Sequence, residues 1–352
     1  MSTTDAMVDD DDVLVHLNHL TKHFPVKQGV FASGKTVVHA VEDVSLTVQR
    51  GETLGIVGES GCGKSTTARL MVRLLAPTSG KVIFDGKDIS RLNQRALRPL
   101  RRQMQMIFQD PYSSLNPRKS VGQIIGEPYT IHRTEKDVKR RVQDLLARVG
   151  LSPEHYNRYP HEFSGGQRQR IGVARAIALQ PKLIVCDEPV SALDVSVQAQ
   201  ILNLLKDLQH DFDLTYVFIS HDLSVIRQIS DRIAVMYLGQ VVELSRSELL
   251  YEHPRHPYTA ALLSAVPRHS TTSGKVERNR IVLGGDVPSP VNPPAACVFH
   301  PRCPRFQRGK CDVDAPELRE FERGHEAACH FPVERWPMTE EELRNPSLGS
   351  AA

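Results

Sequence analysis

A glycine-rich segment that ends in a lysine and a serine is the first feature of this 352-residue chain that could do chemistry. It matches the phosphate-binding pattern G-x-x-x-x-G-K-[ST]. The residues are Gly58, Glu59, Ser60, Gly61, Cys62, Gly63, Lys64, Ser65 and Thr66. Glycines let the backbone curl until successive N–H groups point inward at phosphate oxygens. Lys64 is expected to reach the β- and γ-phosphates of a nucleotide, and the Ser65 hydroxyl to bind Mg²⁺.

Two neighbouring carboxylates, Asp187 and Glu188, follow the apolar residues 183–186. A strand there would deliver both groups to the carboxyl edge of a sheet, where a phosphate-binding loop also lies. Asp187 is suited to hold Mg²⁺, and Glu188 to polarise an attacking water as a general base. Since successive strand residues point to opposite faces, the strand must turn after Asp187, and Pro189 is consistent with a turn.

The elements that must position these residues alternate between strand and helix from residue 13 to about 255. The expected strands include residues 44–48, 54–57, 183–186, 216–220 and 232–237. Several are apolar throughout, which is typical of parallel strands covered on both faces. A helix is expected to start at about Lys64, with Leu70 and Leu74 on its apolar face, and another to cover residues 195–208. The alternation predicts an α/β fold.

Four of the six cysteines gather near the end of the chain, at Cys297, Cys303, Cys311 and Cys329. Residues 256–335 are rich in proline and predict a small irregular domain, which needs a staple because it has little apolar core. Four thiols there suggest a metal. Their spacing fits neither the short pairs of common zinc sites nor the ferredoxin patterns. An iron–sulfur cluster, zinc and unligated thiols all remain open.

Composition limits the class of protein. Hydrophobic residues make up 40% of the chain and charged residues 24%, as in ordinary soluble proteins. The net charge of +3 is too small to argue for nucleic acid, and no such partner is expected. No apolar run approaches the roughly 18–20 residues that span a bilayer. Residues 1–12 are acidic and unlike a secretory signal, so we expect a disordered tail there and a second tail at 336–352. The chain is expected to be soluble and to reach any membrane through a partner.

The segment between the two nucleotide motifs, Phe163 followed by Ser164, Gly165, Gly166 and Gln167, resembles the L-S-G-G-Q signature of ABC ATPases. Other positions resemble further residues of that family: Gln109 the glutamine that senses Mg²⁺ and the γ-phosphate, Asp194 the aspartate at the dimer interface, His221 the histidine that contacts the γ-phosphate, and Phe24 the aromatic that stacks on adenine. The resemblance implies an ABC nucleotide-binding domain over residues 13–255. Such a domain has a RecA-like core, a helical subdomain and an antiparallel β subdomain.

The resemblance to ABC ATPases also implies a mechanism. Two such domains face each other head to tail, and the signature residues of one contact the ATP bound to the other. Lys64, Asp187, Glu188 and His221 are all present, so this chain's own half of the site is expected to hydrolyse ATP. Because Ser164 and its glycines open a helix, the N-terminus of that helix can receive a phosphate.

A narrower resemblance covers residues 13 to about 333. Residues 159–170, 187–196, 253–259 and 288–294 resemble the ATPases of oligopeptide/dipeptide importers, and the chain looks most like the second of their two ATPase subunits. The resemblance implies ATP-driven peptide import at the cytoplasmic face of a bacterial inner membrane. It implies a second ABC ATPase, two membrane permeases and an external solute-binding protein as partners. It also implies a [4Fe–4S] cluster on the four cysteines, with Zn²⁺ as the alternative.

Three other kinds of ABC ATPase compete with this interpretation. DNA-repair members insert a long coiled coil between their halves, for which residues 109–164 leave no room, and translation-type members carry two phosphate loops where this chain has one. A subunit of a phosphonate-cleaving enzyme complex is the nearer alternative. Those relatives lack the cysteine-bearing tail, so the importer is favoured.

Overall fold

The structure, a computed structural model, describes residues 12–26, 36–110, 114–266 and 280–338, together with Glu341 and Arg344. The expected tail at 1–12, apart from Asp12, lies outside the described residues. The same holds for most of the tail expected at 336–352.

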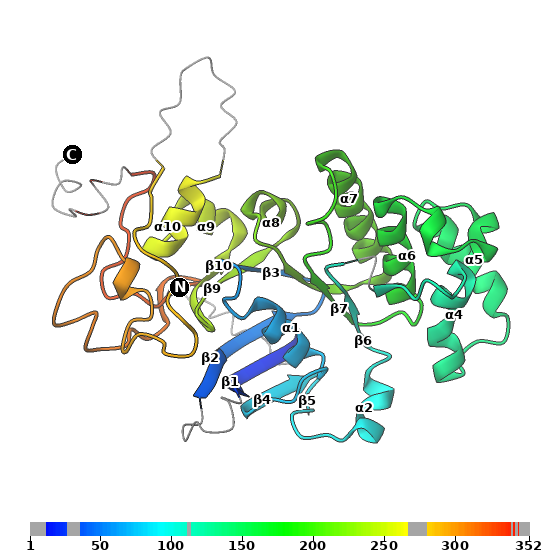
Figure 1. The fold of residues 1–352 in the computed structure, drawn as a ribbon, viewed down its shortest axis with the longest axis horizontal. Coiled ribbons are helices and arrows are strands. Elements are labelled where there is room, and N and C mark those ends of the chain that lie inside the picture. Colours follow the sequence, from blue (N-terminus) through cyan, green and yellow to red (C-terminus); the bar gives the residue numbers. More distant parts are fainter. Residues whose placement is uncertain are drawn as a thin grey trace, which may run out of the picture.

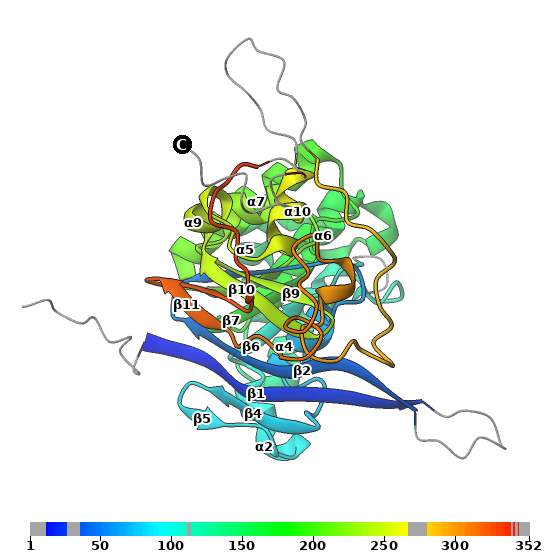
Figure 2. The ribbon, with the colours of Figure 1, turned by 90° about the vertical axis from the view of Figure 1, so that its left-hand side faces the viewer.

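Two β-sheets form the framework of the described residues (Figure 1). The smaller is antiparallel, in the order β2-β1-β4-β5: β2 is Thr36–Gln49, β1 Val13–Val26, β4 Ser79–Phe84 and β5 Lys87–Asp88. The larger sheet has the order β11-β12-β10-β9-β3-β8-β7-β6. Its strands are β11 (Arg319–Glu322), β12 (His325–Ala327), β10 (Gln240–Arg246), β9 (Arg232–Tyr237), β3 (Thr53–Val57), β8 (Thr215–Ile219), β7 (Leu183–Asp187) and β6 (Met104–Ile107). Figure 2 shows the smaller sheet lying across the bottom of the molecule, beneath the larger one.

The centre of the larger sheet is parallel and buried. β3 pairs in parallel with β8 and β9, and β7 with β6 and β8. Because side chains alternate along a strand, Leu183 and Val185 join the core shared with the smaller sheet, while Ile184 and Cys186 join the core shared with the helices. The expected α/β core is confirmed.

Helices cover both faces of the larger sheet. α1 (Lys64–Met71) lies between the two sheets, in contact with β1 and β2 of one and with β7 and β8 of the other (Figure 1). α7 (Val195–Phe212) and α8 (Leu223–Ile229) cover the opposite face. α9 (Ser247–Glu252) and α10 (Pro257–Ser264) follow β10 in the chain, and α2 (Gln94–Leu100) precedes β6. Among the described residues, none of the helices is both long and apolar enough to span a membrane.

One expectation for α1 was wrong. The helix ends at Met71, so Leu74 lies beyond it and is 48% exposed. Arg73 adopts a left-handed backbone conformation with φ of 53°, which turns the chain away from the helix axis. The apolar spacing continued past the point at which the backbone stopped being helical.

A helical group lies at one end of the larger sheet, beside β6 (Figure 1). It comprises α4 (Val121–His132), α5 (Val138–Arg148), α6 (Gly165–Ile177) and the 3₁₀ turns Pro153–Asn157 and Pro160–Glu162. Ser120 and Gln123 form a reciprocal cap that starts α4, and Ile124, Leu146 and Ile171 are fully buried among these helices. The expected helical subdomain is therefore present, as is the antiparallel one.

The segment after residue 255 shares both sheet and core with the rest of the chain. β12 pairs with β10, so β11 and β12 extend the larger sheet. Phe299, which precedes the 3₁₀ turn His300–Arg302, is 1% exposed and packs against Tyr237 and Tyr258. A small core of its own adds Ala260, Ala261, Ile281, Val333 and Met338. The domain boundary at 255/256 stays a prediction.

Candidate nucleotide-binding site

The predicted phosphate loop lies between β3 and α1, and its glycines have conformations that other residues rarely adopt. Gly63 caps α1 with φ of 104°, and a Cβ atom there would lie 2.3 Å from the carbonyl oxygen of Ala40. Gly58 and Gly61 also have positive φ. Ser60 lies between them, and Thr66 is already within α1. The glycine pattern is therefore required by the backbone path of this loop.

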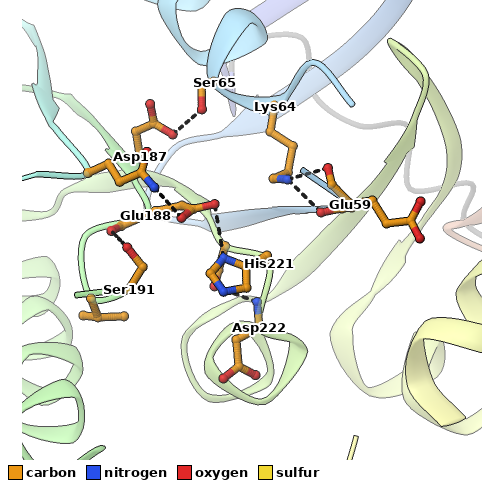
Figure 3. Close-up of polar contacts among 12 residues, drawn as sticks. Glu59, Lys64, Ser65, Asp187, Glu188, Ser191, His221 and Asp222 are labelled. Atoms are coloured by element: carbon orange, nitrogen blue, oxygen red, sulfur yellow. Dashed lines mark hydrogen bonds and ion pairs between the residues drawn. The ribbon is translucent and has the colours of Figure 1, made fainter. Parts of the chain in front are cut away.

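Lys64 and Cys62 are buried within this loop. Lys64 is 5% exposed, and its Nζ donates to the carbonyl oxygens of Gly58, at 2.7 Å, and Glu59, at 3.0 Å (Figure 3). A lysine held over loop carbonyls is poised to exchange them for phosphate oxygens. Burial raises the pKa of the Cys62 thiol, so this side chain stays neutral.

Ser65 and Asp187 meet across the site. The Ser65 hydroxyl donates to Asp187 Oδ1 at 2.7 Å, and Asp187 is 2% exposed (Figure 3). Burial raises the pKa of Asp187, and the Ser65 hydrogen bond opposes that shift. A hydroxyl and a carboxylate are the oxygen ligands that Mg²⁺ prefers, so these two residues fit the ion.

Glu188 turns out of its strand toward the other predicted residues. β7 ends at Asp187, and Glu188 has a left-handed φ of 48°, the turn that the sequence required. Its carboxylate lies 3.2 Å from His221 Nδ1 and accepts a 2.9 Å hydrogen bond from Gln109 Nε2. Figure 3 shows the Glu188 carboxylate directed at the His221 ring. Three chain segments that follow β6, β7 and β8 thus converge.

Gln109 contacts Glu188, not the Ser65–Asp187 pair with which it was predicted to share Mg²⁺. The side chain lies just after β6 and before residues 111–113, which are outside the described part of the chain. Its role as a Mg²⁺ ligand stays a prediction.

The signature residues start α6. The Ser164 hydroxyl accepts from the Gln167 backbone N–H at 3.3 Å, and Gln167 Oε1 accepts from the Ser164 N–H at 3.0 Å. A Cβ atom on Gly166 would lie 2.5 Å from Val197 Cγ1, and Gly165 packs near Leu193. Within the described residues no hydrogen bond joins Ser164–Gln167 to the phosphate loop of the same chain.

Asp194 caps α7. Its carboxylate accepts from the Val197 N–H at 3.0 Å and from the Ser196 hydroxyl at 2.7 Å, and these hydrogen bonds lower its pKa. The neighbouring Val195 is 81% exposed. Asp194 thus anchors a helix start whose first apolar residue faces outward.

Phe24 lies on β1 opposite Val38 of β2, half-buried, with Lys22 Nζ 5.0 Å from its ring centre. A small network that no sequence motif predicted lies next to Phe24. His23 and His39 face each other across the strands, and Glu42 Oε2 lies 2.6 Å from His23 Nε2 and 2.8 Å from His39 Nδ1. Burial alone would raise the pKa of Glu42, but hydrogen bonds from both histidines bring it below its usual value.

The phosphate loop also has partners from the end of the chain, which the sequence analysis missed. The Tyr258 hydroxyl accepts from the Glu59 backbone N–H at 2.8 Å. Arg302 donates to both carboxylate oxygens of Glu59, at 2.7 Å and 3.2 Å. Contacts between residues so far apart in the sequence carry no local signal.

The four C-terminal cysteines form no disulfide and lie near one another. Burial raises the pKa of Cys303 and of Cys329, the latter to about 12, and the other thiols of the set add to both shifts. Cys297 N–H donates to the Cys311 carbonyl oxygen at 3.2 Å. Among the described residues no three of these sulfur atoms lie within 4.8 Å of one another. A tetrahedral zinc site would bring its sulfurs to about 3.8 Å, so the set is wider than such a site.

His325 is close in sequence to Cys329, but its position excludes it as a further ligand for this set. The side chain is fully buried, and its Nε2 lies 2.6 Å from Glu243 Oε1 in β10. The imidazole is therefore already engaged by a buried carboxylate.

Comparison with known proteins agrees with the fold and the motifs. Residues 41–191 match the family described as ABC transporter, and residues 242–311 match the oligopeptide/dipeptide transporter C-terminal region. The solved structure of the ATP-binding cassette MJ0796, a dimer bound to ADP and Pi, superposes with a TM-score of 0.59 at 29% identity. It covers 66% of this chain and 99% of that one. The fold and motifs thus define an ABC-type ATPase.

Relatives over nearly the full length narrow the family. The oligopeptide transport ATP-binding protein AppF of Bacillus subtilis is 54% identical over 92% of this chain and 98% of its own length. The dipeptide transport ATP-binding protein DppF of Escherichia coli is 49% identical over 95% of this chain and 98% of its own length. The chain belongs to the ATP-binding proteins of the oligopeptide/dipeptide ABC transporter family.

Proposed function

We propose that the chain hydrolyses ATP to power peptide import through an ABC transporter. One observation carries the proposal: Gln109, Glu188 and His221 converge beside a phosphate loop in a chain whose residues 242–311 match the oligopeptide/dipeptide C-terminal region. The convergence supplies a site for hydrolysis. The C-terminal match and the names of the relatives supply the substrate class.

The chemistry follows from the geometry. Lys64 exchanges the carbonyl oxygens of Gly58 and Glu59 for phosphate oxygens of ATP, and the loop N–H groups bind the remaining charge. Ser65 and Asp187 hold Mg²⁺, which neutralises phosphate charge when bound. Glu188 accepts a proton from the attacking water. His221 and Gln109 hold the Glu188 carboxylate in place.

A second ABC ATPase completes the site in this proposal. Ser164 and Gln167 cap the start of α6. The first N–H groups of a helix have no partner within the helix, so such a helix start can bind phosphate. Val195, beside Asp194, is exposed in the isolated chain and would be covered by a partner. The MJ0796 cassette is itself dimeric. We propose that the partner here is a different ABC ATPase.

The proposed contact with the membrane permeases lies next to β6, the strand that precedes Gln109. A hollow of about 230 Å³ is lined there by Leu74 and Phe108, which are 48% and 37% exposed. Exposed apolar side chains in a groove are typical of protein interfaces. We propose that two permeases dock on this side, that a solute-binding protein delivers the peptide, and that the chain is peripheral to the cytoplasmic face of the bacterial inner membrane.

We also propose that Cys297, Cys303, Cys311 and Cys329 hold a [4Fe–4S] cluster, with Zn²⁺ as the alternative. Two observations support the cluster. The four sulfur atoms lie near one another but with a wider spacing than a zinc tetrahedron allows, and two of the thiols are buried. The cluster would join parts of a segment with few apolar residues.

Isolation of the native complex tests both proposals in one preparation. Affinity purification of this chain from its own membrane should recover two permeases and a second ABC ATPase, identified by mass spectrometry. Iron and acid-labile sulfide should be present at about four each per chain, and should be lost in Cys303→Ser. Recovery of soluble enzyme subunits, as in a phosphonate-cleaving complex, would contradict the importer. Recovery of zinc without iron would contradict the iron–sulfur cluster and support the Zn²⁺ alternative.

A further inference from the structure

Glu59, a residue of the phosphate loop, is held by the C-terminal part of the chain. Its backbone N–H donates to the Tyr258 hydroxyl at 2.8 Å, from α10. Its carboxylate accepts from Arg302 Nη1 at 2.7 Å and Nη2 at 3.2 Å, from the 3₁₀ turn His300–Arg302. Figure 3 shows the Glu59 side chain pointing away from Glu188 and His221. Glu59 is therefore available for a role other than hydrolysis.

The two groups that hold Glu59 are themselves fixed by packing. Tyr258 is fully buried, with its ring centre 4.8 Å from that of Tyr237 and 5.4 Å from that of Phe299. The Arg302 side chain is 8% exposed, and its Nη1 also lies 3.4 Å from the Tyr237 hydroxyl. A two-pronged, largely buried Arg–carboxylate contact is both stronger and more directional than an exposed ion pair.

Lys64 approaches the same residue from the opposite side. Its Nζ donates to the Glu59 carbonyl oxygen at 3.0 Å and to that of Gly58 at 2.7 Å. These contacts must break when Lys64 turns to phosphate oxygens. Glu59 then keeps its contacts with Tyr258 and Arg302, and its carbonyl oxygen still accepts from the Cys62 N–H at 3.3 Å.

We infer that Arg302 and Tyr258 are positioning residues for ATP binding. By holding Glu59 they keep the phosphate loop in its binding conformation before the nucleotide arrives, which lowers the ordering cost of binding. The family-specific C-terminal segment thus contributes to the affinity of the chain for ATP. The inference rests on the ATP-binding part of the proposed function and is independent of what is transported.

The test measures equilibrium binding of a fluorescent ATP analogue to the full-length chain, in a Glu188→Gln background that blocks turnover. Arg302→Gln should weaken binding about tenfold, as expected for loss of a charged hydrogen bond. Glu59→Gln should weaken it similarly. The double variant should be no weaker than either single variant, because the two changes remove one interaction. Arg302→Lys should recover part of the affinity.

Arg255→Gln is the matched control. Arg255 forms an ion pair with Glu322 within the C-terminal part of the chain and does not contact the phosphate loop. It should leave ATP affinity unchanged even where it lowers the melting temperature. Equal loss of affinity in Arg255→Gln and Arg302→Gln would show general destabilisation and overturn the inference.

Tyr258→Phe keeps the inference falsifiable if Arg302→Gln does not fold. It removes only the hydroxyl that binds the Glu59 N–H and should weaken ATP binding about threefold to tenfold. Unchanged affinity in Tyr258→Phe and in Glu59→Gln would overturn the inference. Failure of the wild-type chain to bind the analogue would instead contradict the proposed function.

Discussion

Glu188 depends on two neighbours and an unusual backbone conformation for its position. Its left-handed φ lets the carboxylate leave the direction of β7 and lie between Gln109 and His221. The Ser191 hydroxyl secures the turn by donating to the Glu188 carbonyl oxygen at 3.1 Å. A strained conformation held by several contacts is characteristic of functional residues.

Glu188→Gln should bind ATP but turn it over at least about 100-fold more slowly at this chain's site, because an amide accepts no proton from water. The change keeps the side-chain shape, so the fold should be unaffected. ATPase activity is measured in a complex whose partner ATPase site is disabled. Glu154→Gln, at an exposed position outside the site, serves as the control. Undiminished turnover in Glu188→Gln would rule out the general base.

The sequence could predict single residues only where a motif fixes their neighbours. Lys64, Ser65 and Asp187 lie where the phosphate loop and an apolar strand placed them. The contacts of Glu42 with His23 and His39 could not be foreseen, because they depend on the register between β1 and β2. Register follows from the whole pattern of the sheet, which no local motif encodes.

At the level of elements, one buried carboxylate on β10 contacts several residues of the C-terminal segment. Glu243 is fully buried, accepts from the backbone N–H groups of Arg255 and His256, and lies 2.6 Å from His325 Nε2. Three parts of the chain thus meet at one side chain. Breaking such a contact would leave a buried charge without partners.

His256 makes this junction sensitive to pH. Burial lowers its pKa to about 4 from 6.5, so the folded chain keeps the imidazole neutral where the unfolded chain binds a proton. Its contribution to stability is present above pH 6.5 and is lost as the pH falls toward 4. The free energy of unfolding should drop by about 3 kcal/mol over that range on its account.

Chemical denaturation of wild type and His256→Gln at several pH values measures this effect. The stability difference between the two chains should narrow by that amount as the pH falls. His210→Gln, at an exposed position, is the control. Its free energy of unfolding should change with pH in parallel with that of wild type. A constant difference between wild type and His256→Gln would contradict the argument.

The sequence predicted strands correctly where a segment is apolar throughout. The apolar runs that became β3, β7, β8 and β9 stood out because parallel strands are buried on both faces. β11 was not recognised, because its sequence Arg319–Glu322 is charged and its place at the sheet edge leaves it exposed. The end of α1 was misplaced for a different reason: the apolar spacing at Leu74 does not reveal the left-handed turn at Arg73.

At the level of the whole molecule, the nucleotide site and the C-terminal segment form one connected structure. β12 adds to the ATPase sheet, Phe299 packs against Tyr237, and Arg302 contacts the phosphate loop. The sequence predicted two adjacent regions of different texture but not their contacts. Long-range pairing of this kind comes from packing between distant segments, which neither composition nor periodicity encodes.

The most direct test of the account is ATP-driven peptide transport by the complete complex. Vesicles are prepared with the cytoplasmic face outward, enclosing the solute-binding protein and a labelled dipeptide. The account predicts that external ATP and Mg²⁺ release the dipeptide with wild type and that Glu188→Gln slows release in proportion to its loss of ATP turnover. ATP hydrolysis without release of any dipeptide or oligopeptide tested would contradict the account.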